Sequence, residues 1–140
     1  MSIVIHHNPD CGTSRSVLAI LCAAGEAPVV IEYLREGWTR PQLLALFAAA
    51  DLTPRAALRT STSPAEALGL LDPAVGEEAL LDAMLAHPVL VNRPIVCSPL
   101  GVRLCRPAAR VLDLMPTLPP GPLATADGTP LIDAAGNRVG

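Results

Sequence analysis

Residues 3–21 read Ile3-Val4-Ile5-His6-His7-Asn8-Pro9-Asp10-Cys11-Gly12-Thr13-Ser14-Arg15-Ser16-Val17-Leu18-Ala19-Ile20-Leu21. This stretch begins with a β-branched apolar run, passes through a turn built on Asn8-Pro9 and ends in apolar residues at helical spacing. The pattern predicts a strand, a loop and a helix. Gly25 can end that helix, and residues 28–34 then predict a second strand. The chain therefore opens with a β-α-β unit, whose two strands are parallel.

Cys11 stands at the predicted N-terminus of the first helix. Backbone N–H groups and the positive end of the helix dipole favour a thiolate there, and they also attract an anion. We expect Gly12, Thr13 and Ser14 to support a Cys11 thiolate from the helix start. His7, four residues earlier, is either a further support for the thiolate or a structural histidine. The position indicates thiolate chemistry on an oxyanion.

The rest of the chain predicts a helical insertion followed by a second half of the sheet. Capping-box patterns at 39–42 and 63–66 and an acidic helix start at 77–78 place the insertion at about residues 39–87. Two short strands joined by a turn at 98–101 then predict a hairpin, and Pro107 begins a last helix. The fold class is α/β, with a small mixed sheet. The order of β-α-β and β-β-α halves matches a thioredoxin-like architecture.

The domain organisation follows from the density of Pro and Gly. Residues 1–115 are expected to form one domain, and the turn signals after Pro116 predict an irregular C-terminal tail at 116–140. No apolar stretch approaches the roughly 20 residues of a membrane span, and no secretory signal pattern opens the chain. We therefore expect a cytoplasmic protein with no membrane partner.

Composition argues against several ligand classes. The net charge is −3 and only three aromatic residues occur, which disfavours nucleic acid as a partner. The four cysteines show no C-x-x-C pair and no zinc spacing, so we expect no metal and no bound cofactor. They are Cys11, Cys22, Cys97 and Cys105. The last three are expected to be ordinary apolar positions.

Three arginines stand at structural junctions and are candidate partners of the oxyanion. Arg59 follows a short helical turn, Arg93 precedes Pro94, and Arg106 occupies the expected N-cap of the last helix. A planar guanidinium pairs with two oxygens at once, and arginine is an unusual N-cap because it cannot accept a hydrogen bond. Each arginine taken alone is better explained as a solvated surface charge, and only together with Cys11 do the three indicate a site.

Four segments, taken together and in order, resemble the glutaredoxin-coupled arsenate reductases. They are His7-Asn8-Pro9-Asp10-Cys11-Gly12-Thr13-Ser14-Arg15, Leu58-Arg59, residues 87–96 around Asn92-Arg93-Pro94, and Gly101-Val102-Arg103-Leu104-Cys105-Arg106-Pro107. The resemblance covers nearly the whole chain, including the tail.

The resemblance implies a thioredoxin-like fold in which Cys11 attacks arsenate while Arg59, Arg93 and Arg106 hold its oxygens. It also implies a cis peptide bond before Pro94, glutathione as co-substrate and glutaredoxin as the partner that completes the reduction to arsenite. Ser14 supports the need for an external thiol independently of the resemblance. Because it stands where a dithiol enzyme has its second cysteine, an external thiol is needed.

Three other functions are alternatives at this point. A Spx-like transcription regulator shares the fold, but Ser14 removes the dithiol switch at this motif. A phosphatase would use a C-x5-R loop, whereas Cys11 and Arg15 give C-x3-R. A glutathione-dependent thiol reductase of unknown substrate also fits. Thr60 follows Arg59 where many relatives would carry a basic residue, which lowers the expected attraction for an oxyanion.

Overall fold

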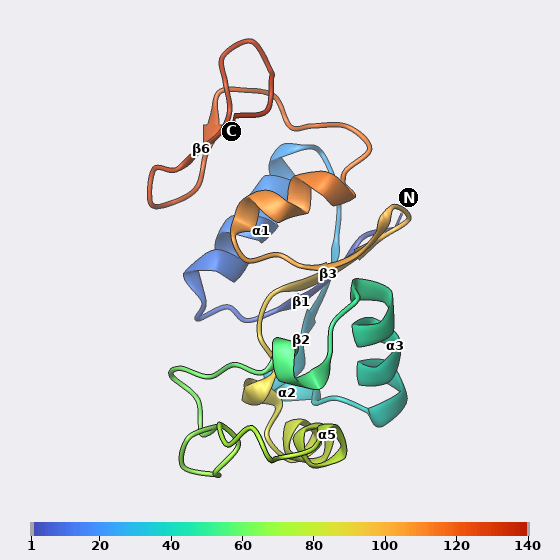
Figure 1. The fold of residues 1–140 in the computed structure, drawn as a ribbon. Helices are drawn as coiled ribbons and strands as arrows, with labels where there is room; N and C mark the ends of the chain where they lie inside the picture. Colours follow the sequence, from blue (N-terminus) through green and yellow to red (C-terminus); the bar gives the residue numbers. More distant parts are fainter. Residues whose placement is uncertain (1, 140) are drawn as a thin grey trace. The chain divides into compact units, whose positions relative to one another are not determined.

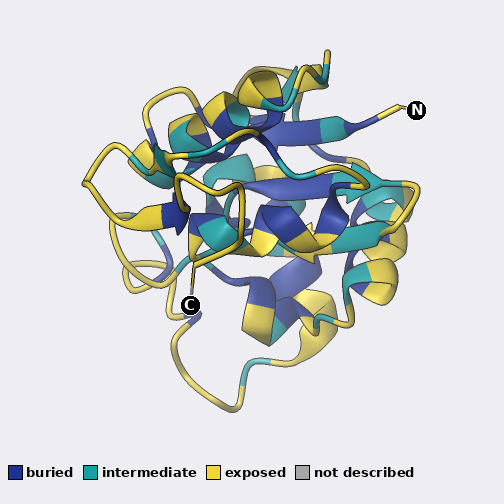
Figure 2. Cartoon of the chain, turned by 90° about the horizontal axis from the view of Figure 1, so that it is seen from above, coloured by how far each residue is buried: buried dark blue, intermediate teal, exposed yellow. Residues whose placement is uncertain are grey.

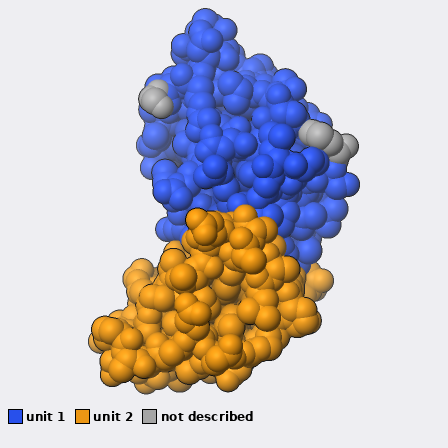
Figure 3. Space-filling view, turned by 45° about the vertical axis from the view of Figure 1, so that its right-hand side comes forward, with its two compact units in different colours: residues 1–32, 93–140 blue, residues 33–92 orange. Residues whose placement is uncertain are grey.

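The computed structural model describes residues 2–139 and contains both predicted halves of the sheet. The strands and helix of the β-α-β half are β1 (Val4–His7), α1 (Gly12–Ala23) and β2 (Val29–Glu32). The later half contains β3 (Ile95–Ser98), β4 (Gly101–Leu104) and the 3-10 helix η2 (Ala108–Leu114). Two compact units result (Figure 3). The first holds the residues up to Glu32 and those from Arg93 onward, and the second holds Tyr33–Asn92.

The four-stranded sheet has the order β2-β1-β3-β4. Strand β1 pairs parallel with β2, with Val4 opposite Val29, and antiparallel with β3, with Val4 opposite Cys97. Strands β3 and β4 form the expected antiparallel hairpin. The sheet is therefore mixed, as predicted, because a helical crossover joins β1 to β2 while a tight turn joins β3 to β4.

Helices α1 and η2 lie side by side on one face of this sheet (Figure 1). Their buried side chains meet the sheet in one apolar core, and Figure 2 shows the buried positions in dark blue. The core residues with no more than 2% exposure include Ile5, Val17, Leu21, Val96 and Val111. The helical spacing of Val17 and Leu21 places both on the face that packs against the sheet.

The C-terminal segment contributes to the same core through a small sheet. Strands β5 (Leu123–Ala124) and β6 (Pro130–Ile132) pair antiparallel across the Asp127-Gly128 turn, although the sequence predicted an irregular tail. The prediction missed this pairing because strands of two and three residues carry no periodic signal. Gly121 is needed here, since a Cβ at this position would lie 1.7 Å from the carbonyl oxygen of Asp133.

The second unit is helical. It contains α2 (Tyr33–Glu36), α3 (Arg40–Ala50), α4 (Pro54–Ala57), α5 (Glu77–Ala86) and the 3-10 turn η1 (Pro88–Leu90). The predicted capping box between Thr39 and Gln42 is present at the start of α3. Residues 63–70 form turns rather than the short helix expected after the second capping box. The Ser63 hydroxyl oxygen accepts a hydrogen bond from the N–H of Ala65, two residues further on, rather than from Glu66 as in a capping box.

Residues 2–139 contain no helix that is both long and apolar enough to cross a membrane. Over the same range, no three His, Cys, Asp or Glu side chains gather in a way that could hold a metal ion. The predicted division into residues 1–115 and 116–140 stays a prediction, and its two outer limits lie outside the described residues.

Candidate active site

The loop between β1 and α1 presents Cys11 at the start of the helix. The Cys11 N–H donates to the carbonyl oxygen of Asn8 at 3.0 Å, and the Arg15 N–H donates to the carbonyl oxygen of Cys11 at 3.0 Å. Cys11 is the N-cap of α1, with extended backbone angles, as the sequence predicts. Its side chain is only 7% exposed. Cys11 therefore lies largely buried at the positive end of a helix.

Ser14 ties the loop to the end of β1. Its hydroxyl oxygen lies 2.6 Å from His7 Nδ1 and accepts a hydrogen bond from the Asn8 N–H at 3.0 Å. Both Ser14 and His7 are buried. The backbone N–H of Ser14 donates to the Cys11 sulfur. One residue therefore orders the loop through its hydroxyl and supports the thiolate through its amide.

Arg93 and Arg106 meet Cys11 from the other half of the sheet. Arg106 Nη1 donates to Cys11 Sγ at 3.6 Å and to the carbonyl oxygen of Arg93 at 3.1 Å. The guanidinium of Arg93 also hydrogen-bonds the sulfur. Arg106 was expected at the N-cap of the last helix, but Pro107 occupies that position. Arg106 therefore lies one residue before the N-cap of η2.

The pKa of the Cys11 thiol is lowered by these neighbours. Burial alone raises it, but the Ser14 N–H, the charge and hydrogen bond of Arg93, and the hydrogen bond of Arg106 together outweigh burial. Each of these groups stabilises the charged form of the sulfur. The site therefore favours a nucleophilic thiolate, which is the reactive form of cysteine.

His7 has a lowered pKa as well. Burial is the largest cause, and the positive charge of Arg15 acts in the same direction while Glu32 opposes both. Since an ordinary histidine titrates near pH 6.5, the His7 ring is neutral at pH 7. It therefore contacts the Ser14 hydroxyl as a neutral hydrogen-bonding group rather than as a cation beside Cys11.

The other candidate residues fall into different surroundings. Burial raises the pKa of the Cys97 thiol, and it raises that of Cys105 to about 12, so neither is a ready nucleophile. Cys22 is exposed, whereas the sequence predicted that it would lie on an apolar helix face.

Arg59 belongs to the second unit, where its Nε donates to the carbonyl oxygen of Ser61 and its Nη2 donates to the hydroxyl of Thr62. The exposed residue Thr60 follows it.

Two residues whose side chains hold the loop before α1 were not among the predicted site residues. Asn8 is buried, and its side-chain oxygen accepts from the Asp10 N–H at 2.9 Å. Arg15 Nη1 donates to the carbonyl oxygen of Pro9 at 2.8 Å. The Asn-Pro pair predicted a turn, and asparagine commonly closes such a turn through its own side chain. That signal could have identified Asn8, whereas nothing in the local sequence indicates the contact of Arg15.

The fold and site define a class of protein: a thioredoxin-like domain with a cysteine at a helix start, whose sulfur accepts hydrogen bonds from two arginines. The model of the ArsC family matches residues 6–114. The chain belongs to this family. Its curated relatives include an arsenate reductase of Synechocystis sp., 64% identical over 98% of both chains. Another is an arsenate reductase of Escherichia coli strain K12, 44% identical over 99% of this chain and 98% of that one.

Solved structures agree with the family assignment. An arsenate reductase from Vibrio cholerae superposes with a TM-score of 0.77 at 39% identity, covering 82% of this chain and 98% of that chain. A protein described as an arsenate reductase from Yersinia pestis gives a TM-score of 0.74 at 33% identity, covering 79% and 98%. The predicted thioredoxin-like fold is confirmed, and the implied cis peptide bond between Arg93 and Pro94 is present.

Proposed function

We propose that this chain is an arsenate reductase that uses the Cys11 thiolate as its nucleophile. The observation that carries the proposal is the environment of the sulfur. In a member of the ArsC family, a single cysteine receives hydrogen bonds from Ser14, Arg93 and Arg106, and these lower its pKa. Such a site favours both the attacking thiolate and a substrate that is itself an anion.

Arginines and helix amides together suit a tetrahedral oxyanion. Arg93 and Arg106 would each offer a planar pair of N–H donors, and Arg59 would complete the set as the resemblance implies. Gly12 and Thr13 would contribute their free N–H groups at the start of α1. The charges that stabilise the thiolate are thus the charges that would hold the arsenate oxygens.

The first chemical step forms a bond between Cys11 Sγ and arsenic(V), and one arsenate oxygen leaves as water after taking up protons. The glutathione thiol then forms a second sulfur–arsenic bond and displaces a second oxygen as water. Ser14 explains why this second thiol comes from outside, since no cysteine stands three residues after Cys11. No bound cofactor is required for either step.

Glutaredoxin would complete the reduction. Its thiolate attacks the glutathione sulfur, and the sulfur–arsenic bond breaks with its electron pair staying on arsenic, which becomes arsenic(III). The two sulfurs form a glutaredoxin–glutathione disulfide, so two electrons leave the thiols and two reach arsenic. Water then displaces Cys11 and arsenite departs. A cytoplasmic location suits this sequence because glutathione keeps thiols reduced there.

A coupled assay tests the function. With glutathione, glutathione reductase and glutaredoxin present, arsenate should cause NADPH oxidation, and omitting glutaredoxin should remove most of it. Cys11→Ser should lower turnover to the background rate, because a serine hydroxyl is not ionised at neutral pH. Cys22→Ser is the matched control, since Cys22 is an exposed cysteine of the same helix. Arsenate turnover by the Cys11→Ser protein would contradict the mechanism.

A further inference from the structure

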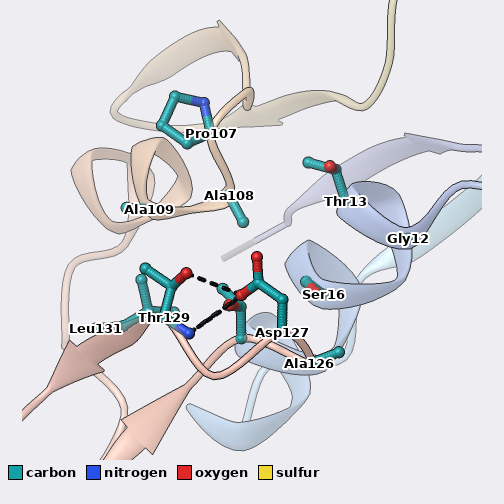
Figure 4. Close-up of a pocket in the computed structure, with 11 residues that line it drawn as sticks. Gly12, Thr13, Ser16, Pro107, Ala108, Ala109, Ala126, Asp127, Thr129 and Leu131 are labelled. Carbon is teal, nitrogen blue, oxygen red and sulfur yellow. Dashed lines mark hydrogen bonds between the residues drawn. The ribbon is translucent and has the colours of Figure 1, made fainter.

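The C-terminal segment and the first turn of α1 line a groove of about 350 Å³ in the first unit (Figure 4). Among the described lining residues, Asp127 is the charged one, and its Oδ1 accepts hydrogen bonds from Thr125 and Thr129 of the same turn. Neither arginine that donates to the Cys11 sulfur is among the described residues that line the groove. The loop after Arg59, by contrast, contacts a candidate oxyanion partner directly.

This loop of the second unit holds the Arg59 side chain in a closed set of hydrogen bonds. Arg59 Nε donates to the carbonyl oxygen of Ser61 at 3.2 Å, and Nη2 donates to the hydroxyl oxygen of Thr62 at 2.7 Å. The Thr62 hydroxyl in turn donates to the same carbonyl oxygen of Ser61 at 2.7 Å. These three bonds, here called the Arg59 clasp, form a ring that holds the guanidinium along its Nε–Nη2 edge.

The backbone of Arg59 is anchored as well. Its N–H donates to the carbonyl oxygen of Leu90 at 2.8 Å, and its carbonyl oxygen accepts from the Ser63 hydroxyl. The preceding residue, Leu58, forms an antiparallel bridge with Val91, and both are buried. Because the backbone and one edge of the guanidinium both have partners, the clasp restricts the orientations that the Arg59 side chain adopts.

Thr62 has a backbone conformation that threonine rarely adopts. Its φ is 52°, in the left-handed region, where a β-branched residue is an outlier. Asp51, which also has a positive φ, ends α3 as its C-cap, whereas Thr62 ends no helix. Thr62 is exposed, so burial does not account for its conformation. Strained residues persist where surrounding contacts outweigh the strain, and here the contact is the hydroxyl on Arg59 Nη2.

A guanidinium carries five N–H donors in a rigid planar fork. The clasp engages the edge formed by Nε and Nη2, and the edge formed by Nη1 and Nη2 lies at the end of the side chain. We infer that Thr62 is a positioning residue, whose hydroxyl orients Arg59 so that this end edge is presented to the oxyanion. Thr62 itself does not touch the substrate. The inference rests on the proposed function for the role of Arg59.

The clasp should act on substrate binding rather than on the chemical step. A side chain that is already ordered loses less conformational entropy when it binds a ligand. Without the Thr62 hydroxyl, Arg59 samples more orientations, and ordering it opposes arsenate binding. The bond between sulfur and arsenic forms at Cys11 and does not involve Thr62. The Michaelis constant for arsenate should therefore rise while kcat stays unchanged.

Thr62→Val tests this in the coupled assay, because it removes the hydroxyl and keeps a β-branched side chain. The KM for arsenate should rise about three- to tenfold, the range for one hydrogen bond, with kcat unchanged. Thr62→Ser keeps the hydroxyl and should restore the KM. Thr60→Val is the matched control, since Thr60 is an exposed threonine of the same loop outside the clasp. Its KM should equal that of the unmodified chain.

Thr62→Gly separates positioning from folding. Glycine adopts a positive φ without strain, so this variant should keep the melting temperature of the unmodified chain and still show the raised KM. A merely structural role of Thr62 would instead reduce the fraction of folded enzyme, which lowers kcat and leaves KM in place. An unchanged KM in both Thr62→Val and Thr62→Gly would overturn the inference.

Arsenate binding to the Cys11→Ser protein provides a readout without turnover. In NMR spectra, arsenate should shift the Arg59 Nε–H signal, and adding Thr62→Val should raise the dissociation constant about three- to tenfold. An Arg59 signal that arsenate does not shift, or an unchanged dissociation constant, would overturn the clasp and leave the reductase intact. Weakened binding with Thr62→Val, in a chain whose Cys11 form does not reduce arsenate, would support the clasp and overturn the reductase.

Discussion

The pKa of Cys11 is lowered both by a neighbour in the sequence and by residues far along the chain. The Ser14 N–H lies three residues away and follows from the helix start, whereas Arg93 and Arg106 arrive from the second half of the sheet. Burial opposes all three by raising the pKa. The local amide and the distant arginines together outweigh burial and lower the pKa of the thiol.

Removing Arg106 should raise the pKa of Cys11. The lowered pKa means that alkylation by iodoacetamide should begin at a lower pH than for an ordinary cysteine, because only the thiolate reacts. In Arg106→Gln the hydrogen bond from the charged guanidinium to the sulfur is lost, so the thiolate is less stable and the midpoint should move to higher pH. Mass spectrometry of the Cys11 peptide across a pH series measures this.

Arg110→Gln provides the control for that series. Arg110 is an exposed arginine of η2 and is not among the groups that shift the Cys11 pKa. Its replacement should leave the midpoint in place. A midpoint that stays unchanged in Arg106→Gln would show that the 3.6 Å contact does not influence the sulfur.

At the scale of elements, two helix starts were predicted correctly from local sequence, whereas the capping-box pattern at 63–66 did not lead to a helix. Cys11 and Thr39 occupy the N-cap positions that the sequence indicates, because capping depends on residues within one turn. Arg106 was displaced from its expected cap by Pro107, whose fixed φ suits the extended position before η2. The loops between helices depend on distant partners and were less predictable.

Arg55 shows how such a loop is held in the second unit. Its guanidinium donates to the carbonyl oxygens of Leu70, Asp72 and Val75, at 2.5, 3.1 and 2.9 Å. Arg55→Ala should lower the free energy of unfolding by about 2 kcal/mol, since hydrogen bonds to charged donors contribute more than neutral ones. Urea denaturation of the full chain measures the change.

Arg40→Ala is the comparison for Arg55→Ala. Arg40 pairs with Glu78 and Asp82, both of which are exposed, and such surface pairs contribute at most about 1 kcal/mol. If the two variants lose the same stability, the loop of residues 70–75 does not depend on Arg55.

At the scale of the whole molecule, the C-terminal segment joins the core of the first unit. Leu131 is 2% exposed and belongs to the same apolar cluster as Val17 and Val111. Leu131→Ala should cost about 2–5 kcal/mol of stability because it leaves a cavity among these side chains. Leu100→Ala, at a position 57% exposed, should cost less than about 0.5 kcal/mol. Thermal or chemical unfolding of both variants distinguishes a packed tail from a loosely attached one.

The sequence by itself determined the strand, loop and helix around Cys11, the mixed sheet and the absence of a second cysteine at position 14. These follow from periodicity, turn residues and single-position chemistry, which act over a few residues. The tertiary structure alone decided that Arg106 reaches a sulfur 95 positions away, and that the tail forms a groove beside α1. Such contacts depend on how packed elements bring distant side chains together, and no local pattern encodes them.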